Sequence, residues 1–288
     1  MIAQIFAVVI FLAMFILIIT EVWERHIVTL GCALLTLILV FGICMHSPSA
    51  IIETLNIHSI FSPGFWHTAG EASEASAGIN WETIVFIAGM MIMVEGMALS
   101  GFFSWLCLTI AKAVRYNTTK IFIMFMILAF VLSMFIDSIT VILFLAAITI
   151  TQSKLLQFDP IPVIIAEIFC SNLGGSSTMC GDPPNIIIGT ALHYTFTDFL
   201  TNTGVIAIIC LVLMIFFFYM CFRKKLGKRN LSEEEIEKMP TPQSAITNKR
   251  AFIISTVIFL CAVILLGTHG QTGLTVSTIG IIAASKAK

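Results

Sequence analysis

The chain has 288 residues, of which 58% are hydrophobic and only 11% are charged, and its mean hydropathy is +1.03. A soluble domain does not need so much apolar surface, so the composition excludes that class and predicts an all-α polytopic membrane protein in a lipid bilayer. The formal net charge of −1 gives no indication of a nucleic-acid partner, and we expect none.

Apolar runs predict the spanning helices. The first run lacks the basic start and the small-residue cleavage site of a signal peptide, so we expect it to be retained as a spanning helix. The runs long enough to cross a bilayer are 2–20, 27–45, 83–99, 204–222 and 252–268.

The basic residues predict the orientation of the chain. Eight of the fifteen lysines and arginines lie in 223–251, which the positive-inside rule assigns to the cytoplasm. Arg25 places the first turn on the same side, and the segment 46–80 has no lysine or arginine. We therefore expect a multi-pass protein of the plasma membrane with its N-terminus outside.

The same rule shapes the middle of the chain. If 101–115 crossed the membrane, the basic residues that follow it would lie outside, so we expect an interfacial helix there. The segment 120–154 has a lysine at each end and Asp137 at its middle. Each arm has about 16 residues and reaches roughly 24 Å, short of a comfortable span. This pattern predicts a re-entrant helical hairpin with "DSIT", 137–140, at its tip.

A broken helix is predicted over 161–193. We expect a helix over 161–171, a break over 172–185 and a half-helix from Ile186, because "SNLGGSSTMCGDPPNIIIGT" is rich in Gly, Pro, Ser, Asn and Asp. Unpaired backbone groups are costly in lipid, so such a break persists only inside protein or around a wet cavity. Its exposed N–H and C=O groups suit ions of either sign, and a break at mid-depth is typical of a transporter's binding site. The alternative is a kink without a ligand.

Four acidic residues in apolar surroundings are candidates for ion or proton binding. Asp137 is the strongest, although it also suits the N-cap of the second hairpin arm. Asp182 precedes two prolines, where the ordinary role of an aspartate is to cap a turn. Glu167 and Glu95 are possible proton relays, with the surface as the alternative for Glu95.

No catalytic or metal-binding pattern accompanies these acids. The eight cysteines form no CxxC pair, and the histidines show no zinc-like spacing. We therefore expect neither an enzyme nor a cofactor, and no metal beyond a coupling Na⁺; H⁺ is the alternative coupling ion.

Three segments resemble the ion transporter superfamily that includes arsenite permeases, D-type sodium/proton antiporters, the melanosomal P protein and citrate-transporter-like permeases. They are "NWETIVFIAGMMIMVEGMALSGFF", 80–103, "LSMFIDSIT", 132–140, and "SNLGGSSTMCGDPPNIIIG", 171–189. The resemblance implies an elevator-type secondary transporter with two inverted repeats, each containing a re-entrant hairpin and a broken helix. The binding residues that it implies are Asp137, Ser138, Thr140, Ser171, Asn172, Gly174, Gly175, Thr178, Asp182 and Asn185. The usual tip reads Asp-Asn-x-Thr, and Ser138 replaces that Asn here.

The resemblance also predicts how the chain is divided. Residues 1–222 correspond to a first repeat, 223–251 to a cytoplasmic basic loop and 252–288 to the start of a second repeat that stops at "SKAK". We expect a truncated product, or a carrier completed by a separate chain or by a second copy of this one.

The functional expectation is an arsenite or anion permease coupled to an ion or proton gradient, with a small inorganic or organic ion as substrate. A Na⁺/H⁺ antiporter and a citrate or dicarboxylate transporter are alternatives within the same superfamily. An inactive fragment or a membrane interaction protein is the alternative outside it.

Overall fold

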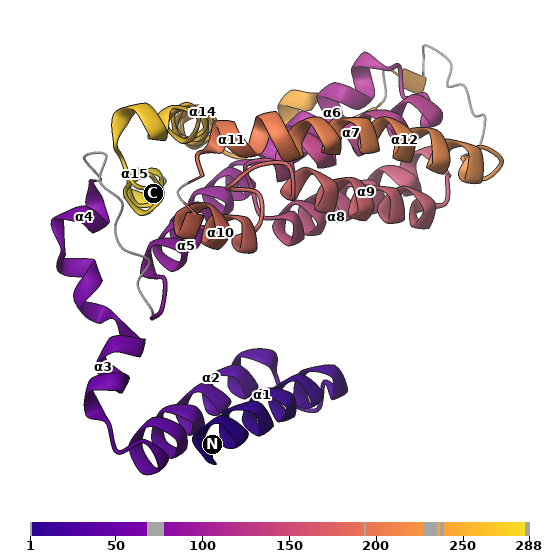
Figure 1. The fold of residues 1–288 in the computed structure, drawn as a ribbon. Helices are drawn as coiled ribbons and strands as arrows, with labels where there is room; N and C mark the ends of the chain where they lie inside the picture. The colour runs from indigo at the N-terminus through magenta and orange to yellow at the C-terminus, as the bar shows by residue number, and fades with distance from the viewer. Residues whose placement is uncertain (1, 68–77, 193, 227–234, 237–238, 286–288) are drawn as a thin grey trace. The chain divides into compact units, whose positions relative to one another are not determined.

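The computed structural model describes residues 2–67, 78–192, 194–226, 235–236 and 239–285. Across these ranges the chain is helical and no β-strand is present, apart from an isolated bridge between His67 and Leu274 (Figure 1). Within the described residues, six helices are long and apolar enough to cross a membrane: 2–20, 25–44, 81–100, 138–156, 196–222 and 249–272. The predicted class, an all-α polytopic membrane protein, is confirmed.

The chain forms two compact units. Unit 1 comprises residues 1–61 and 76–81, and unit 2 comprises 62–75 and 82–288. In unit 1, α1 (Ile2–Thr20) packs against α2 (Arg25–Leu35) and the π-helix η1 (Thr36–Cys44) that continues it. The short helices α3 (Pro48–Leu55) and η2 (Ile57–Phe61) follow.

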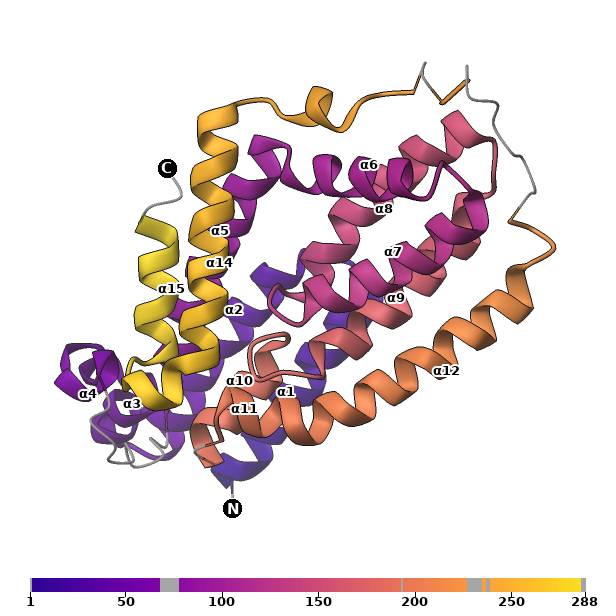
Figure 2. The same ribbon diagram turned by 90° about the horizontal axis from the view of Figure 1, so that it is seen from above.

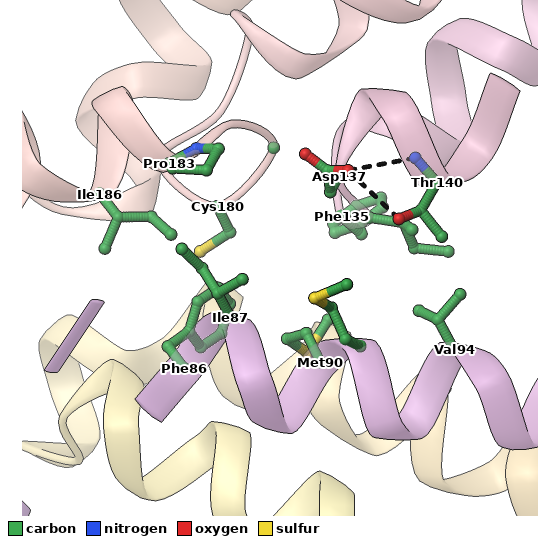
Figure 3. Close-up of a pocket in the computed structure, with 13 residues that line it drawn as sticks. Phe86, Ile87, Met90, Val94, Phe135, Asp137, Thr140, Cys180, Pro183 and Ile186 are labelled. Carbon is green, nitrogen blue, oxygen red and sulfur yellow. Dashed lines mark hydrogen bonds between the residues drawn. The ribbon is translucent and has the colours of Figure 1, made fainter. Parts of the chain in front are cut away.

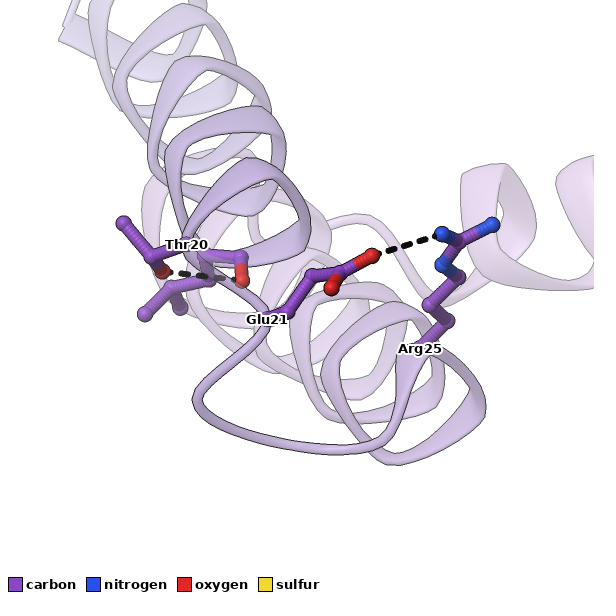
Figure 4. Close-up of polar contacts among 4 residues, drawn as sticks. Thr20, Glu21 and Arg25 are labelled. Carbon is purple, nitrogen blue, oxygen red and sulfur yellow. Dashed lines mark hydrogen bonds and ion pairs between the residues drawn. The ribbon is translucent and has the colours of Figure 1, made fainter.

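The helices of unit 1 turn sharply between α1 and α2. Glu21 takes a φ of 51°, and its carboxylate accepts a hydrogen bond from the Arg25 guanidinium at 2.9 Å (Figure 4). Beside it, the Thr20 hydroxyl donates to the Leu17 carbonyl at 3.1 Å. Along α1, only Ile10 is buried. This helix is apolar on nearly all sides, as expected for a helix that faces lipid.

Unit 2 contains the remaining helices. The elements in chain order are α4 (Pro63–Trp66), α5 (Trp81–Ser100, whose first residue belongs to unit 1), α6 (Phe102–Ala113), α7 (Thr118–Ser133), α8 (Ser138–Leu156), α9 (Pro160–Gly175), α10 (Pro183–Leu192), α11 (Phe196–Phe199), η3 (Leu200–Gly204), α12 (Val205–Phe222), η4 (Pro242–Ala245), α14 (Lys249–Thr272) and α15 (Val276–Ser285).

The core of unit 2 is the packing of α9 against α7, α8 and α12 (Figure 2). The buried residues of α7 include Phe122, Phe125 and Met126, none of which is exposed. The tip joins α7 to α8, and the break follows α9. The packing of these helices on one another therefore positions both the tip and the break.

The predicted interfacial helix corresponds to α6. It begins after Gly101, whose φ of 89° suits glycine, and it ends before Arg115 and Tyr116, which both take a positive φ.

The hairpin arms correspond to α7 and α8. The second arm, with 19 residues, is longer than the predicted 16, because α8 continues to Gln157, which ends it in the left-handed conformation. The re-entrant topology and the division into repeats stay predictions.

The predicted limits of the broken helix are wrong by several residues. The first helix does not stop at 171 but continues to Gly175, and the second starts at Pro183 rather than at Ile186. Gly174 permits close packing of α9 on α7, and proline is well tolerated in the first turn of a helix. The break is therefore the short segment 176–182.

Parts of three predicted segments lie outside the described residues. They are residue 193 of the broken helix, residues 227–234 and 237–238 of the basic loop, and the chain end 286–288.

Candidate functional site

The hairpin tip is the turn between α7 and α8, and Asp137 caps it. One carboxylate oxygen of Asp137 accepts hydrogen bonds from the Thr140 backbone N–H at 3.1 Å and from the Thr140 hydroxyl at 3.2 Å (Figure 3). This is the N-cap that the sequence predicts, and it satisfies an N–H group that has no partner within the helix. The other carboxylate oxygen of Asp137 points away from Thr140 (Figure 3).

The helix break is fastened by Asn185. Its side-chain amide donates to the carbonyl of Gly175 at 3.1 Å and to the carbonyl of Thr178 at 2.9 Å. Helices end with carbonyl groups that lack partners within the helix, and inside a membrane protein these groups need other donors. Asn185 therefore joins the start of α10 to the end of α9 across the break.

Side chains also tie the tip to the break. The Ser138 hydroxyl donates to the Asp182 carboxylate at 2.9 Å, and the Ser171 hydroxyl donates to the Ser138 carbonyl at 3.0 Å. The Thr178 hydroxyl donates to the carbonyl of Met134 in the tip turn. These bonds join sequence positions some forty residues apart. We call the residues of the tip and the break that make them the tip–break cluster: Asp137, Ser138, Thr140, Ser171, Thr178, Asp182 and Asn185.

Two of the predicted glycines allow the end of α9 to lie close to α7 and to the break. A Cβ atom on Gly174 would overlap the backbone of Phe130 on α7, and a Cβ atom on Gly175 would overlap the Asp182 carboxylate. Small residues allow helix backbones to approach closely in membrane proteins. Gly174 and Gly175 therefore shape the site without supplying a polar side chain.

The tip–break cluster has acidic groups, and no described basic residue forms an ion pair with them. Asp137 and Asp182 are near enough to interact electrostatically. Among the described residues, the ion pairs are Arg25 with Glu21 and His26 with Glu24, both in unit 1. The N-termini of α8 and α10, which carry partial positive charge, follow the two aspartates directly. This arrangement leaves negative charge that a bound cation or proton could balance.

A pocket lies beside the cluster, between the tip, the break and α5. Asp137 and Thr140 supply its polar side, whereas α5 supplies an apolar wall that includes Phe86 and Met90 (Figure 3). The full lining is Phe86, Ile87, Met90, Met91, Val94, Phe135, Ile136, Asp137, Thr140, Cys180, Gly181, Pro183 and Ile186. A small ligand in this pocket would meet one polar face and one apolar face.

The structure does not bring every candidate residue to the cluster. Asn172 is exposed, and its side chain donates to the Ile168 carbonyl one turn earlier in α9 at 2.8 Å. Glu95 is exposed on α5. Glu167 is fully buried, and its carboxylate accepts a hydrogen bond from the Thr149 hydroxyl on α8 at 2.7 Å.

Sequence reasoning missed two residues at the site. The buried Ser133 shares a hydrogen bond with Ser171, and Cys180 lines the pocket. Ser133 lies four residues before Asp137 at the end of an apolar arm, and that position was the available signal. Cys180 lies within the predicted break, 172–185, rather than in an apolar run, and that position was the available signal.

Comparison with known proteins gives matches along the chain. A family model described as citrate transporter matches residues 6–287. The chain is 33% identical over 138 residues to an uncharacterized transporter of Mycobacterium tuberculosis, 34% identical over 137 residues to a 46 kDa membrane protein of Mycobacterium leprae, and 37% identical over 142 residues to the P protein of Homo sapiens. Each alignment covers 48% of this chain, but only 32% of each mycobacterial protein and 17% of the P protein. The chain therefore matches less than a third of the length of either mycobacterial relative and a smaller share of the P protein.

Proposed function

Because this chain belongs to the citrate transporter family, a family of transporters rather than of enzymes, we propose that it acts as a secondary carrier for a small anion, coupled to a cation gradient. The observation that carries this proposal is the pair of aspartates at the tip–break cluster. Asp137 and Asp182 interact electrostatically, and neither has a basic partner in the described part of unit 2. Na⁺ or H⁺ would balance their charge, and broken helices at mid-membrane are typical of such sites.

The anion belongs to the pocket beside the cluster. A cation bound between Asp137 and Asp182 would neutralise the polar side of the pocket, and the N-termini of α8 and α10 would then favour an anion. Cation binding would therefore have to accompany anion binding, which is the coupling that a secondary carrier requires. Arsenite and citrate or another dicarboxylate are the substrates to test.

A Na⁺/H⁺ antiporter is the second candidate. It is favoured by the same two carboxylates, because an acidic pair can exchange a proton for Na⁺ without any anion. The two functions differ in one measurable respect, since antiport moves protons in the absence of an anion.

The test is transport by the purified chain in proteoliposomes with an imposed Na⁺ gradient. We expect gradient-dependent uptake of radiolabelled citrate or arsenite, lost in Asp137→Asn and retained in Asp159→Asn. Asp159 is a matched control because it caps α9 as Asp137 caps α8, but lies outside the cluster. A proton flux driven by Na⁺ without any anion would favour the antiporter. No flux of either kind from a folded chain would contradict transport by this chain and by copies of it, and would leave either a carrier completed by a separate chain or a membrane interaction protein.

We also propose that a second repeat completes the carrier, supplied by a partner chain or by a second copy of this one. The resemblance of the hairpin and the broken helix to one repeat of the ion transporter superfamily supports this. The mass of the assembly in lipid nanodiscs tests it: a dimer or a complex is expected, and a transport-competent monomer would contradict it.

The proposed orientation places the N-terminus outside and 223–251 in the cytoplasm of a plasma-membrane protein. Single cysteines at Lys120 and Lys154, in a background without other cysteines, should both react from the cytoplasmic side. Labelling from opposite sides would discard the re-entrant hairpin formed by α7 and α8.

A further inference from the structure

A second polar site lies inside unit 2, between α8 and α9. Glu167 on α9 is fully buried, and so is Thr149 on α8, while Gln152 is 3% exposed. The two helices lie side by side (Figure 1). Thr149 and Gln152 are three residues apart on α8 and therefore share a face of that helix.

The polar atoms of this site are only partly satisfied. One carboxylate oxygen of Glu167 accepts the hydrogen bond from Thr149 at 2.7 Å. The other carboxylate oxygen of Glu167, together with both the oxygen and the nitrogen of the Gln152 side-chain amide, has no hydrogen-bond partner in the described part of the chain. Buried polar groups are nearly always paired. A carboxylate on α9 and an amide on the face of α8 that carries its partner Thr149 are both left incomplete, and they call for a ligand.

In the described part of the chain, no ion pair balances a charge on Glu167. Lys154 on α8, Lys120 on α7 and Lys112 on α6 are all exposed. The titratable groups that interact with Glu167 electrostatically are the thiols of Cys107 on α6 and Cys170 on α9. The helix α12, which also packs against α9, contains no Asp, Glu, His, Lys or Arg. An ionised Glu167 would therefore be an unpaired buried charge, which costs far more than a buried neutral group.

We infer that the interface between α8 and α9 holds a proton-binding site: the Glu167 carboxyl carries the proton, and the Gln152 side-chain oxygen accepts the hydrogen bond from it. The carboxyl group of Glu167 then donates through one oxygen and accepts from Thr149 through the other. A proton needs this single acceptor. A metal cation would need several oxygen ligands, and the site offers few beyond Glu167 and Gln152.

This site is separate from the tip–break cluster but lies on the same side of α9. Glu167 precedes Ser171 by four residues, so the two side chains project from one face of α9 about 6 Å apart along the helix. Ser171 bonds to the tip at the Ser138 carbonyl. The inference does not depend on the proposed Na⁺ site, because it requires only the packing of α8 on α9. The two ideas can therefore fail separately.

Infrared spectroscopy of the full chain in lipid nanodiscs tests the inference at neutral pH. A protonated carboxyl group has a C=O stretch that is distinct from the bands of a carboxylate. We expect such a band in the wild-type chain, its loss in Glu167→Gln and its retention in Glu53→Gln, because Glu53 lies exposed on α3 of unit 1.

A second variant separates proton binding from simple packing. Gln152→Leu keeps the volume of the side chain but removes the acceptor, so the carboxyl band should remain and shift to higher frequency. Monodisperse size-exclusion profiles would show that each variant is folded. A spectrum unchanged by Glu167→Gln would overturn the inference, as would a carboxylate signal at Glu167 that depends on Na⁺. A band unmoved by Gln152→Leu would overturn the assignment of Gln152 as the partner.

Discussion

The helices α1 and α9 are both apolar, yet they are used in opposite ways. α1 buries one of its 19 residues, Ile10. α9 has 16 residues and buries eight of them: Pro162, Val163, Ala166, Glu167, Cys170, Ser171, Gly174 and Gly175. Six residues of that buried set, all except Pro162 and Val163, are small or polar. The difference teaches that hydropathy identifies a helix for the membrane, whereas small and polar residues within it identify the helix that builds the site.

The largest effect should come from a cavity at the core around α9. Phe125 on α7 is fully buried, so Phe125→Ala should cost about 3–5 kcal/mol of unfolding free energy. Phe11 on α1 is 55% exposed, and Phe11→Ala should cost much less because lipid replaces the lost contacts. Thermal unfolding in detergent micelles checks both, and equal losses would erase the distinction between the two helices.

Close packing at Gly174 should give the next largest effect. Gly174→Ala places a methyl group on the backbone of Phe130 and should destabilise the chain by about 1–3 kcal/mol. Gly31 in α2 has open space around it, so Gly31→Ala should instead stabilise its helix by up to about 1 kcal/mol. The opposite signs of the two changes in melting temperature are the result to look for; two changes of the same sign would count against the close contact.

Asn185 should matter through the carbonyls that it satisfies. Asn185→Ala leaves the Gly175 and Thr178 carbonyls without their donor and should cost about 1–3 kcal/mol. In Asn202→Ala the lost bond is an exposed one, to the Asp198 carbonyl one turn earlier, so a much smaller loss is expected. Chemical denaturation of both variants provides the comparison. If the two losses match, Asn185 does not fasten the break.

The smallest effect should come from the turn of unit 1. The Glu21–Arg25 ion pair is largely exposed, at 70% and 74% of the side-chain surfaces. Exposed pairs contribute at most about 1 kcal/mol, so Glu21→Gln should lower the melting temperature only slightly. High salt should reduce even this difference, because it screens exposed charges. A loss as large as that of Gly174→Ala would be inconsistent with an exposed pair.

How much of this could be predicted from the sequence depended on the kind of signal. Long apolar runs predicted the class of the protein because their length must match the bilayer. The sequence also predicted that Asp137 caps the N-terminus of α8, because a helix cap is a local interaction. The limits of the break could not be predicted. Asn172 and the two glycines after it are poor helix formers, yet they remain in α9, since packing against α7 outweighs their propensities.

Contacts between distant segments also could not be predicted from the sequence. Asp182 was expected to cap its own turn, and the hydrogen bond from Ser138 follows only once the tip and the break are folded together. The same holds for Glu167, whose partner Thr149 lies on another helix. Conversely, Asn172 is a polar residue next to the predicted break and was expected at the site, but it lies exposed. A helix places neighbouring residues on different faces, and Asn172 faces away from the site that Ser171 contacts.

Equilibrium binding of radioactive Na⁺ to the purified chain tests the central claim most directly, because it needs neither a known anion nor a second repeat. The wild-type chain and Asp159→Asn should both bind Na⁺ saturably, whereas Asp137→Asn and Asp182→Asn should not. Competition by H⁺ but not by K⁺ would agree with a site built for coupling. Absence of saturable binding in the folded wild-type chain, or equal binding in Asp137→Asn, would contradict the assignment of the tip–break cluster as a Na⁺ site.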